Sequence, residues 1–259
     1  MNRLLAAALG TLLCAAFPVH AKEWTAIRFA TDANYPPFES KAPDGTLMGF
    51  DIDLGNEICQ RLHARCQWIE NAFDGMIPGL KARKFDAVLS SMSMTPKRRE
   101  QIAFSVRLYN TASRLITKKG SGLVPTVASL AGKSVGVEQG TVQETYGRTY
   151  WEPHGVRIVP YQNQDQVYAD LASGRLDAVL QNQVQADVAF LKTPRGKDFA
   201  FSGNALHDAK VLGEGTGIGL RLDDADLKAK IDGAIDGMRK DGTYQRIARR
   251  YFNFDIYGE

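Results

Sequence analysis

The sequence predicts an α/β protein built from two similar lobes that face each other. Short strand-like runs alternate with helical patterns along most of the chain, which indicates mostly parallel sheets. The phrase Asp-Ala-Val-Leu occurs twice, in KFDAVLSS at 84–91 and in RLDAVLQN at 175–182. Each copy follows a helical pattern and ends in two polar residues. A repeated unit of this kind favours two lobes of one design, although the phrase is also common in buried strands.

The first half of the chain gives the patterns for the first lobe. Residues 27–31 form a strand-like run that leads into the turn signal Asn-Tyr-Pro-Pro at 34–37. Residues 51–62 carry apolar side chains close to helical spacing. We expect the next elements to be a strand at 66–70, a helix at 74–83, a buried strand at 86–89, and a helix that begins at Pro96 with Thr95 as its N-cap.

The second half repeats this order. Thr141 and Glu144 form a capping box, which predicts a helix start directly after the Gly140 turn. Asp241-Gly242 is a stop signal that separates the two closing helices. We expect strands at 134–137, 156–161, 177–180 and 218–221, and further helices at 166–172, 184–192, 227–240 and 243–251.

Residues 1–21 have the pattern of a signal peptide. Arg3 is followed by an apolar run and then by Val19-His20-Ala21, which predicts a mature chain that begins at Lys22. A lipid-bearing Cys14 is an alternative that the preceding residues disfavour. No later segment has the roughly 18 apolar residues of a membrane span. We therefore expect an exported, soluble protein.

Composition limits the partners and the chemistry of the mature chain. Removing Arg3 from the 32 basic residues leaves 31 against 29 acidic residues, a net charge of +2, which argues against nucleic acid and membrane surfaces as partners. Cys59 and Cys66 are seven positions apart, which favours a small-loop disulfide in an oxidising compartment. A metal site is disfavoured because no His or second cysteine pair stands at ligand spacing.

Polar residues follow both Asp-Ala-Val-Leu strands. Ser90-Ser91 ends the first copy and Gln181-Asn182 ends the second. Ligands of α/β sheets bind outside the carboxyl ends of the strands. We therefore expect the two lobes to present these residues to one cleft.

Several stretches together resemble the bacterial family 3 extracellular solute-binding proteins of amino-acid ABC importers. Within that family they are most like the lysine/arginine/ornithine-binding and histidine-binding periplasmic proteins. The similarity spans residues 27–258, and its landmarks are GFDIDL at 49–54, FDGMIPGLKARKFDAVLSSMSMTPKRREQIAFS at 73–105, VGVEQGTVQETY at 135–146 and DGTYQRIARRYFNFDIYG at 241–258.

The resemblance implies a type II periplasmic-binding-protein fold with two lobes joined by a two-strand hinge. Residues 22–110 and 213–259 would form lobe I, and residues 111–212 would form lobe II. It also implies a disulfide between Cys59 and Cys66, a periplasmic location, a monomer, and an inner-membrane permease complex as partner. The ligand would be a free amino acid, with no cofactor or metal. The hinges would lie near 110–114 and 210–215.

The ligand's carboxylate is expected to meet Arg98, a planar two-pronged donor at the first turn after Thr95-Pro96. The resemblance adds Ser91 and Ser93, and from the other lobe the backbone N–H of Val142 beside the helix start at Thr141. An alternative for Arg98 is a solvated position in the run Lys97-Arg98-Arg99.

The ligand's side chain is expected to lie between two rings. The resemblance assigns Tyr35 and Phe73 to the walls around its stem and Asp32 to its distal cationic group, with Gln143 and the Ser90 carbonyl close by. Each ring could instead belong to the core, and Asp32 could cap its own turn.

Two positions depart from the basic amino-acid binders. Asn182 stands where they carry an aspartate that holds the α-ammonium, and Glu138 stands where they carry a leucine. Glu138 would either restore the missing charge, face another cationic group of the ligand, or point into solvent. Opine-binding relatives share the asparagine, so an opine of the octopine or nopaline type is an alternative ligand.

The leading hypothesis is therefore a periplasmic receptor for a cationic L-amino acid, arginine first, with lysine, ornithine and histidine behind it. A polar-amino-acid receptor is a further alternative. An enzyme is not expected, although some proteins of this fold are dehydratases. The mature chain's three histidines, His63, His154 and His207, lie away from the predicted strand ends, and no nucleophile elbow is present.

Overall fold

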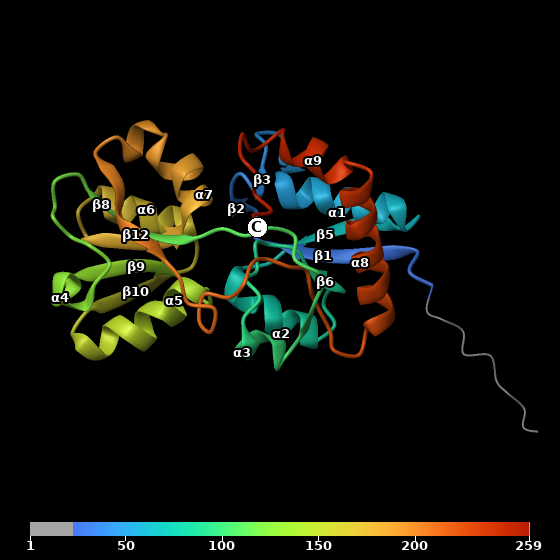
Figure 1. Cartoon of the computed structure of the whole chain (residues 1–259), viewed down its shortest axis with the longest axis horizontal. Helices are drawn as coiled ribbons and strands as arrows, with labels where there is room; N and C mark the ends of the chain where they lie inside the picture. Colours follow the sequence, from blue (N-terminus) through green and yellow to red (C-terminus); the bar gives the residue numbers. More distant parts are fainter. Residues whose placement is uncertain (1–22, 259) are drawn as a thin grey trace, which may run out of the picture.

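The computed structural model describes residues 23–258 and consists of two lobes side by side (Figure 1). The expected signal peptide, residues 1–21, lies outside the described residues. Each lobe contains one five-stranded sheet with helices around it, so the predicted two-lobe α/β fold is confirmed. Within residues 23–258, no helix has the length and apolar character needed to cross a membrane.

The first lobe is built on a mixed sheet with β6 at its centre. β1 runs parallel to both of its neighbours, whereas β13 runs antiparallel to both of its own. The strands, in spatial order, are β5 (Arg65–Glu70), β1 (Ala26–Thr31), β6 (Ala87–Val88), β13 (Gly219–Leu220) and β7 (Ala103–Phe104).

Helices and a small second sheet surround this sheet. The helices are α1 (Phe50–Arg61), α2 (Met76–Lys81), α3 (Pro96–Arg99), α8 (Ala225–Lys240) and α9 (Thr243–Ala248), with the 3-10 turn η1 (Phe73–Gly75) before α2. The small antiparallel sheet consists of β2 (Asn34–Tyr35), β3 (Glu39–Lys41) and β4 (Leu47–Met48).

The second lobe has the same plan. β9 runs parallel to both neighbours, and β8 runs antiparallel to both of its own. The strands, in spatial order, are β10 (Arg157–Tyr161), β9 (Ser134–Glu138), β11 (Ala178–Asn182), β8 (Ser113–Lys118) and β12 (Phe199–Leu206). The helices are α4 (Val127–Leu130), α5 (Val142–Tyr146), α6 (Gln164–Ala172) and α7 (Gln183–Ala186), with the π-helical η2 (Gly147–Trp151) and η4 (Asp187–Leu191) and the 3-10 turns η3 (Glu152–His154) and η5 (Pro194–Gly196).

The two Asp-Ala-Val-Leu copies form β6 and the first part of β11. Each is the middle strand of its sheet, with a parallel neighbour on one side and an antiparallel neighbour on the other. The sheets are therefore less parallel than the sequence suggested. The strand that runs against the others is β13 in the first sheet and β8 in the second. The sequence predicted β13 as a strand without its direction, and no strong pattern predicted β7, β8 or β12. β12 is an edge strand with mostly half-buried residues, so it lacks a clean hydrophobic alternation.

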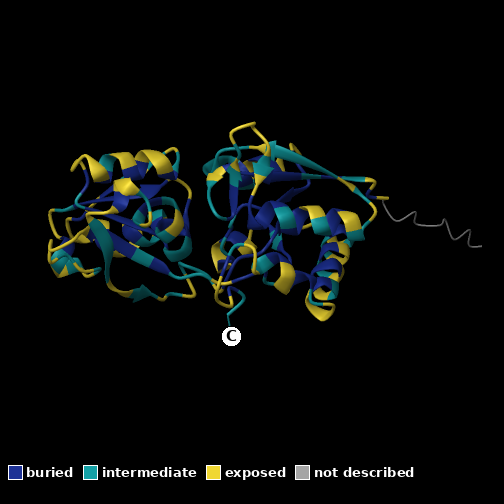
Figure 2. Ribbon diagram, turned by 90° about the horizontal axis from the view of Figure 1, so that it is seen from above, coloured by how far each residue is buried: buried dark blue, intermediate teal, exposed yellow. Residues whose placement is uncertain are grey.

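Buried residues concentrate inside each lobe rather than between them (Figure 2). Every strand of the first large sheet lies within 26–104 or 219–220, and every strand of the second lies within 113–206. The segments between these ranges cross from one lobe to the other. The lobe boundaries after residues 110 and 212 stay a prediction.

A disulfide joins Cys59 near the end of α1 to Cys66 at the start of β5, with the two Cα atoms 5.7 Å apart. The expected pairing is confirmed. In the chain-entropy model, closing a loop of this size stabilises the fold by roughly 2–3 kcal/mol.

Candidate functional site

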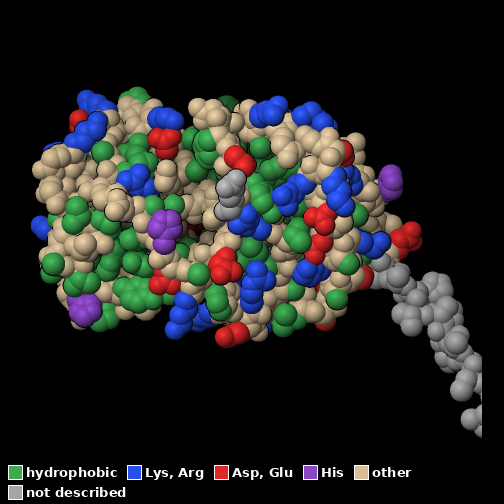
Figure 3. Space-filling view, viewed as in Figure 1, with side chains coloured by type: hydrophobic (Ala, Val, Ile, Leu, Met, Phe, Trp, Pro, Cys, Tyr) green, Lys and Arg blue, Asp and Glu red, His purple; other side chains and the backbone are tan. Residues whose placement is uncertain are grey.

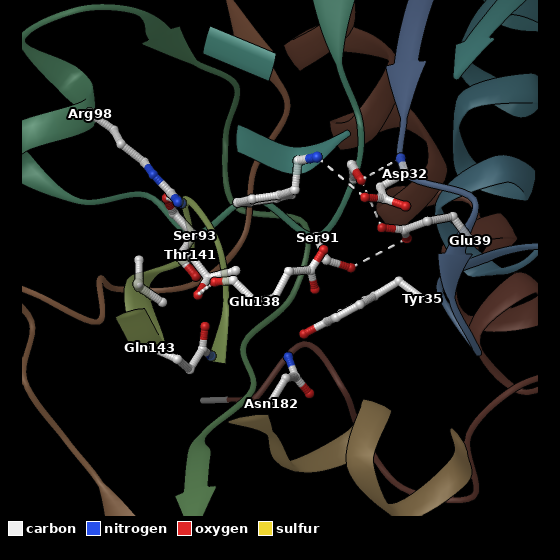
Figure 4. A pocket seen from close by; sticks show the side chains of 13 residues that line it. Asp32, Tyr35, Glu39, Ser91, Ser93, Arg98, Glu138, Thr141, Gln143 and Asn182 are labelled. Carbon is white, nitrogen blue, oxygen red and sulfur yellow. Dashed lines mark hydrogen bonds between the residues drawn. The ribbon is translucent and has the colours of Figure 1, made fainter. Parts of the chain in front are cut away.

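All twelve predicted site residues line one cavity between the lobes (Figure 4). A thirteenth lining residue, Glu39, was not predicted. The wall from the first lobe consists of Asp32, Tyr35, Glu39, Phe73, Ser90, Ser91, Ser93 and Arg98, and the wall from the second consists of Glu138, Thr141, Val142, Gln143 and Asn182.

Arg98 is positioned by the helix start that the sequence predicted. The Thr95 hydroxyl accepts a hydrogen bond from the Arg98 N–H (3.2 Å) and so caps α3. The guanidinium donates to the carbonyls of Ser93 (2.8 Å) and Gly140 (3.0 Å), and forms no ion pair within residues 23–258. The residue is only 8% exposed, which rules out the solvated alternative. Burial lowers the pKa of Arg98 to about 10, so an anion beside it would relieve a desolvated positive charge.

Phe73 lies between Arg98 and Asp32. The Arg98 guanidinium carbon is 5.5 Å from the centre of the Phe73 ring, and the Phe73 N–H donates to Asp32 Oδ2 (3.2 Å). Asp32 Oδ1 also accepts from Asn34 Nδ2 (3.3 Å), so the carboxylate caps its own turn and lines the cavity at once. Burial raises the pKa of Asp32.

Tyr35 and Phe73 are both partly buried and pack against the core of the first lobe while lining the cavity. The two interpretations of each ring, core residue and cavity wall, are therefore compatible. Tyr35 also reaches across the cavity, because its hydroxyl donates to Gln181 Oε1 (2.8 Å).

Glu39 is the cavity residue that sequence reasoning missed. Its carboxyl group accepts from the Ser90 hydroxyl (2.9 Å) and the Ser91 hydroxyl (3.4 Å), and the residue is 1% exposed. The signal that could have found it is the Pro-Pro turn, read as a hairpin. In the β2–β3 pair, Tyr35 stands opposite Glu39, so one predicted cavity residue places the other on the same face.

A second carboxyl group, Asp51, lies beneath Glu39 and holds Ser91 in place. Asp51 Oδ2 accepts from the Ser91 N–H (2.8 Å), and Asp51 Oδ1 accepts from the Tyr109 hydroxyl (2.9 Å). Ser91 has a positive φ of 50°, a conformation that these bonds stabilise. Burial, above all, raises the pKa of Asp51 to about 7 and that of Glu39 well above its usual range. The charge of Asp51 adds to the rise in the pKa of Glu39.

The helix start of α5 forms much of the second lobe's wall. The Thr141 hydroxyl accepts from the Glu144 N–H (3.2 Å) and donates to the Glu138 carbonyl (2.6 Å). The first N–H groups of any helix, here including that of Val142, lack acceptors inside the helix. Gln143 is fixed by a hydrogen bond from its Nε2 to the Ser113 hydroxyl (2.9 Å).

Both the oxygen and the nitrogen of the Asn182 side-chain amide form hydrogen bonds within the protein. Oδ1 caps α7 by accepting from the N–H groups of Val184 (2.9 Å) and Gln185 (3.2 Å). Nδ2 donates to the Thr111 hydroxyl (2.6 Å) in a segment that crosses between the lobes. The residue therefore brings a neutral, rigid amide to the cavity.

Glu138, the last residue of β9, lines the cavity and is 4% exposed, which rules out the solvent-facing alternative. Burial and the adjacent Asp32 raise its pKa well above the usual range. One cavity thus combines a buried cation at one side with acidic side chains at the other. Such a cavity can hold a ligand that carries a carboxylate and a separate positive charge.

Residues 27–254 match the family model of the bacterial extracellular solute-binding proteins, family 3. The chain belongs to this family. The resemblance seen in the sequence is therefore confirmed.

Two relatives and one solved structure place the family 3 protein more closely. It is 53% identical over 233 residues to the lysine/arginine/ornithine-binding periplasmic protein of Escherichia coli K12, covering 90% of each chain. It is 52% identical over 232 residues to the histidine-binding periplasmic protein of Salmonella typhimurium, covering 90% of this chain and 89% of that one. An ancestral arginine-binding protein bound to arginine superimposes with a TM-score of 0.83 at 32% identity, over 90% of this chain and 100% of that one.

The two lobes of this family 3 protein touch at the rim of the cavity. Gln139 Nε2 in the second lobe donates to Asp74 Oδ2 in the first (3.0 Å). Gly140 has a φ of 79°, and a Cβ atom there would lie 2.7 Å from the Asp74 Cα. Glycine at this position therefore permits the approach of the two lobes that the structure shows.

Proposed function

We propose that this family 3 protein is the periplasmic substrate-binding protein of an ABC importer and binds a cationic L-amino acid. Arginine is the first candidate, followed by lysine, ornithine and histidine. One observation carries the proposal. The buried Arg98 guanidinium, which has no acidic partner in the described chain, and the buried Asp32 carboxylate lie at opposite sides of the same cavity (Figure 4).

In the proposed complex, the ligand's α-carboxylate accepts from Arg98 in the first lobe and from the Val142 N–H in the second. The apolar stem lies between the rings of Tyr35 and Phe73, and the distal cation faces Asp32. Because the two lobes contribute different contacts, the bound ligand stabilises the closed form over the open one. The permease would recognise the closed protein.

The named relatives support this ligand class, since they are binding proteins for lysine, arginine, ornithine and histidine. The small net charge of the mature chain does not favour nucleic acid or a membrane surface as a partner. On the face in Figure 3, Lys and Arg side chains are interspersed with Asp and Glu rather than gathered in one patch.

The test is a thermal-shift screen of ligand-stripped protein against single amino acids and opines. We expect arginine to raise the melting temperature most, with the other cationic amino acids behind it and glutamate without effect. A ranking led by a neutral or acidic amino acid would contradict the proposal. Stripping by unfolding and refolding is required, because retained ligand would mask the shift.

A second candidate ligand is an opine, and one feature of the cavity favours it. A neighbouring pocket beside the lobe-crossing segments shares Ser93, Gln143 and Asn182 with the main cavity. A substituent on the ligand's α-nitrogen would find room there, and a neutral Asn182 suits a secondary amine. Octopine or nopaline binding more tightly than arginine in the same screen would favour this ligand.

We propose a binding protein without catalytic activity, because Arg98, Asp32 and the two rings are accounted for as ligand contacts. The two relatives compared above are named as binding proteins. Turnover of a cyclohexadienyl substrate by the purified protein would contradict this and indicate a dehydratase.

A further inference from the structure

We propose that Glu138 and Asp32, one from each lobe, together receive the ligand's distal cationic group, so that this group's charge draws the lobes closed. The inference rests on the proposed function and adds a residue that determines specificity. Its consequence is that the ligand's side-chain charge, and not only its carboxylate, contacts both lobes.

The two acids occupy equivalent places in the two lobes. β1 and β9 occupy the same position in their sheets, each parallel to both neighbours and beside an Asp-Ala-Val-Leu strand. Asp32 directly follows β1, and Glu138 is the last residue of β9. The two carboxyl groups therefore extend from the carboxyl ends of equivalent strands into one cavity (Figure 4).

Neither acid forms an ion pair with a basic side chain of the described residues. Asp32 is 8% exposed and Glu138 is 4% exposed. Two buried carboxylates that face each other repel, unless a proton or a cation lies between them. Burial, the charge of Asp32 and a hydrogen bond with it raise the pKa of Glu138, which fits a shared proton in the ligand-free protein.

Among the residues that line the cavity, Arg98 alone has a positively charged side chain. The remaining titratable or charged groups that surround the pair are Tyr35 on β2, Glu39 on β3, Asp74 on η1, Arg98 on α3 and Tyr168 on α6. Arg98 is the cation, and the proposed ligand carboxylate neutralises it. The acids at the other side are thus left for the ligand's own positive charge.

Glu138 lies at the distal end of the proposed ligand rather than beside its α-ammonium. The α-ammonium adjoins the carboxylate and so stays close to Arg98. The Phe73 ring adjoins the Arg98 guanidinium, and the Phe73 backbone N–H contacts Asp32. Besides burial, Asp32 and then Asp74, which directly follows Phe73 in the chain, raise the pKa of Glu138. The two ends of the Asn182 amide instead bind Thr111 and the start of α7. Glu138 therefore does not replace the charge that Asn182 lacks.

A pair of carboxylates from opposite lobes favours a guanidinium over an ammonium. The guanidinium is planar and presents N–H donors along several edges, so that it can bind one carboxylate on each side. An ammonium group is a compact, strongly hydrated charge that gains less from two such partners. The pair therefore predicts arginine ahead of lysine.

The test is calorimetric titration of arginine and citrulline into ligand-stripped wild type, Glu138→Gln, Asp32→Asn and the double variant. Citrulline has nearly the same shape but carries a neutral urea group in place of the guanidinium. We expect Glu138→Gln to weaken arginine binding about 10- to 100-fold, the loss of one buried charge-assisted bond, with little change for citrulline. Glu152→Gln, an exposed glutamate of the second lobe outside the cavity, is the matched control and should change neither affinity.

A proton count gives a readout that a structural role for Glu138 would not change. Titrations at about pH 6.5 in two buffers of different ionisation enthalpy report the protons released on binding. Arginine should displace the shared proton of the acid pair, whereas citrulline should not. Glu138→Gln should reduce the release.

If Glu138→Gln leaves the ratio of arginine affinity to citrulline affinity unchanged, whether both affinities fall equally or neither falls, the inference is overturned. If Asp32→Asn alone lowers that ratio, the proposed function stands and the role of Glu138 fails. If the wild type binds no cationic amino acid, the proposed function itself fails. Should Glu138→Gln not fold, Glu138→Asp keeps the charge on a shorter side chain and should lower the arginine-to-citrulline ratio only partly; an unchanged ratio would again contradict the inference.

Discussion

The two Asp-Ala-Val-Leu strands end in very different surroundings. After β6, Ser90 and Ser91 bind two buried acids, Glu39 and Asp51, whose pKa values are raised. At the end of β11, Gln181 and Asn182 bind neutral partners. Gln181 accepts from Tyr35 across the cavity, and Asn182 caps α7.

This difference shows how one scaffold can carry two kinds of wall. The strands are equivalent in sheet order and pairing, so backbone hydrogen bonds and apolar packing set their positions. The residues directly after them set the chemistry. The first lobe supplies most of the charge, and the second supplies amides, the N–H groups of a helix start and a single carboxyl group, Glu138.

The largest expected effect comes from removing the acid after β1. Asp32→Ala should cost arginine binding about 2–5 kcal/mol, because it leaves the ligand's cation buried without this partner. The preference for arginine over neutral amino acids in a thermal-shift panel should disappear. An unchanged ranking would refute the assignment of Asp32. Asp223→Ala, an exposed aspartate of the same lobe outside the cavity, is the control.

An acid at the end of β11 tests whether the neutral amide there weakens the binding of arginine. Asn182→Asp should tighten arginine binding by about 1.5–3 kcal/mol, because a carboxylate would meet the α-ammonium while still capping α7. Isothermal calorimetry measures the change. Weaker arginine binding would show instead that the amide is matched to the physiological ligand, as for an opine.

A substitution at Gly140 tests whether ligand binding requires the contact between Gly140 of the second lobe and Asp74 of the first. Gly140→Ala would place a methyl group against Asp74 and force a side chain into a left-handed conformation, at a cost of about 1–3 kcal/mol in the closed form. We expect weaker arginine binding and a smaller decrease of the radius of gyration on ligand addition in solution scattering. Full closure with wild-type affinity would contradict this role of Gly140.

The smallest effect concerns the acids beneath Ser91. Since the folded-state pKa values of Glu39 and Asp51 lie above their unfolded values, the native state binds more protons than the unfolded state. Their contribution to stability is therefore present below about pH 4 and is lost as the pH rises to about 7 and beyond.

Thermal unfolding of ligand-stripped protein between pH 5 and 8 measures this contribution. The melting temperature should fall less steeply with pH in Asp51→Asn than in the wild type. Identical slopes would contradict the raised pKa values. Gln181 and Asn182 at the end of β11 are neutral amides and should not change how the melting temperature depends on pH.

Much of this site was predictable because its residues follow recognisable elements. Thr95 with Pro96, and Thr141 with Glu144, mark the helix starts that place Arg98 and Val142. Glu39 could not be found in the same way, because its burial depends on a hairpin that the sequence presents only as a turn. A single sequence likewise does not show that Asp32 raises the pKa of Glu138. The two residues are 106 positions apart and come together only across the cavity.

The most direct test of the account is a crystal structure of the protein with L-arginine bound. We expect the α-carboxylate on Arg98 and the Val142 N–H, and the guanidinium between Asp32 and Glu138, with the lobes closed. A reversed ligand, a guanidinium that contacts only one lobe, or arginine bound in the cavity beside the lobe-crossing segments would contradict it.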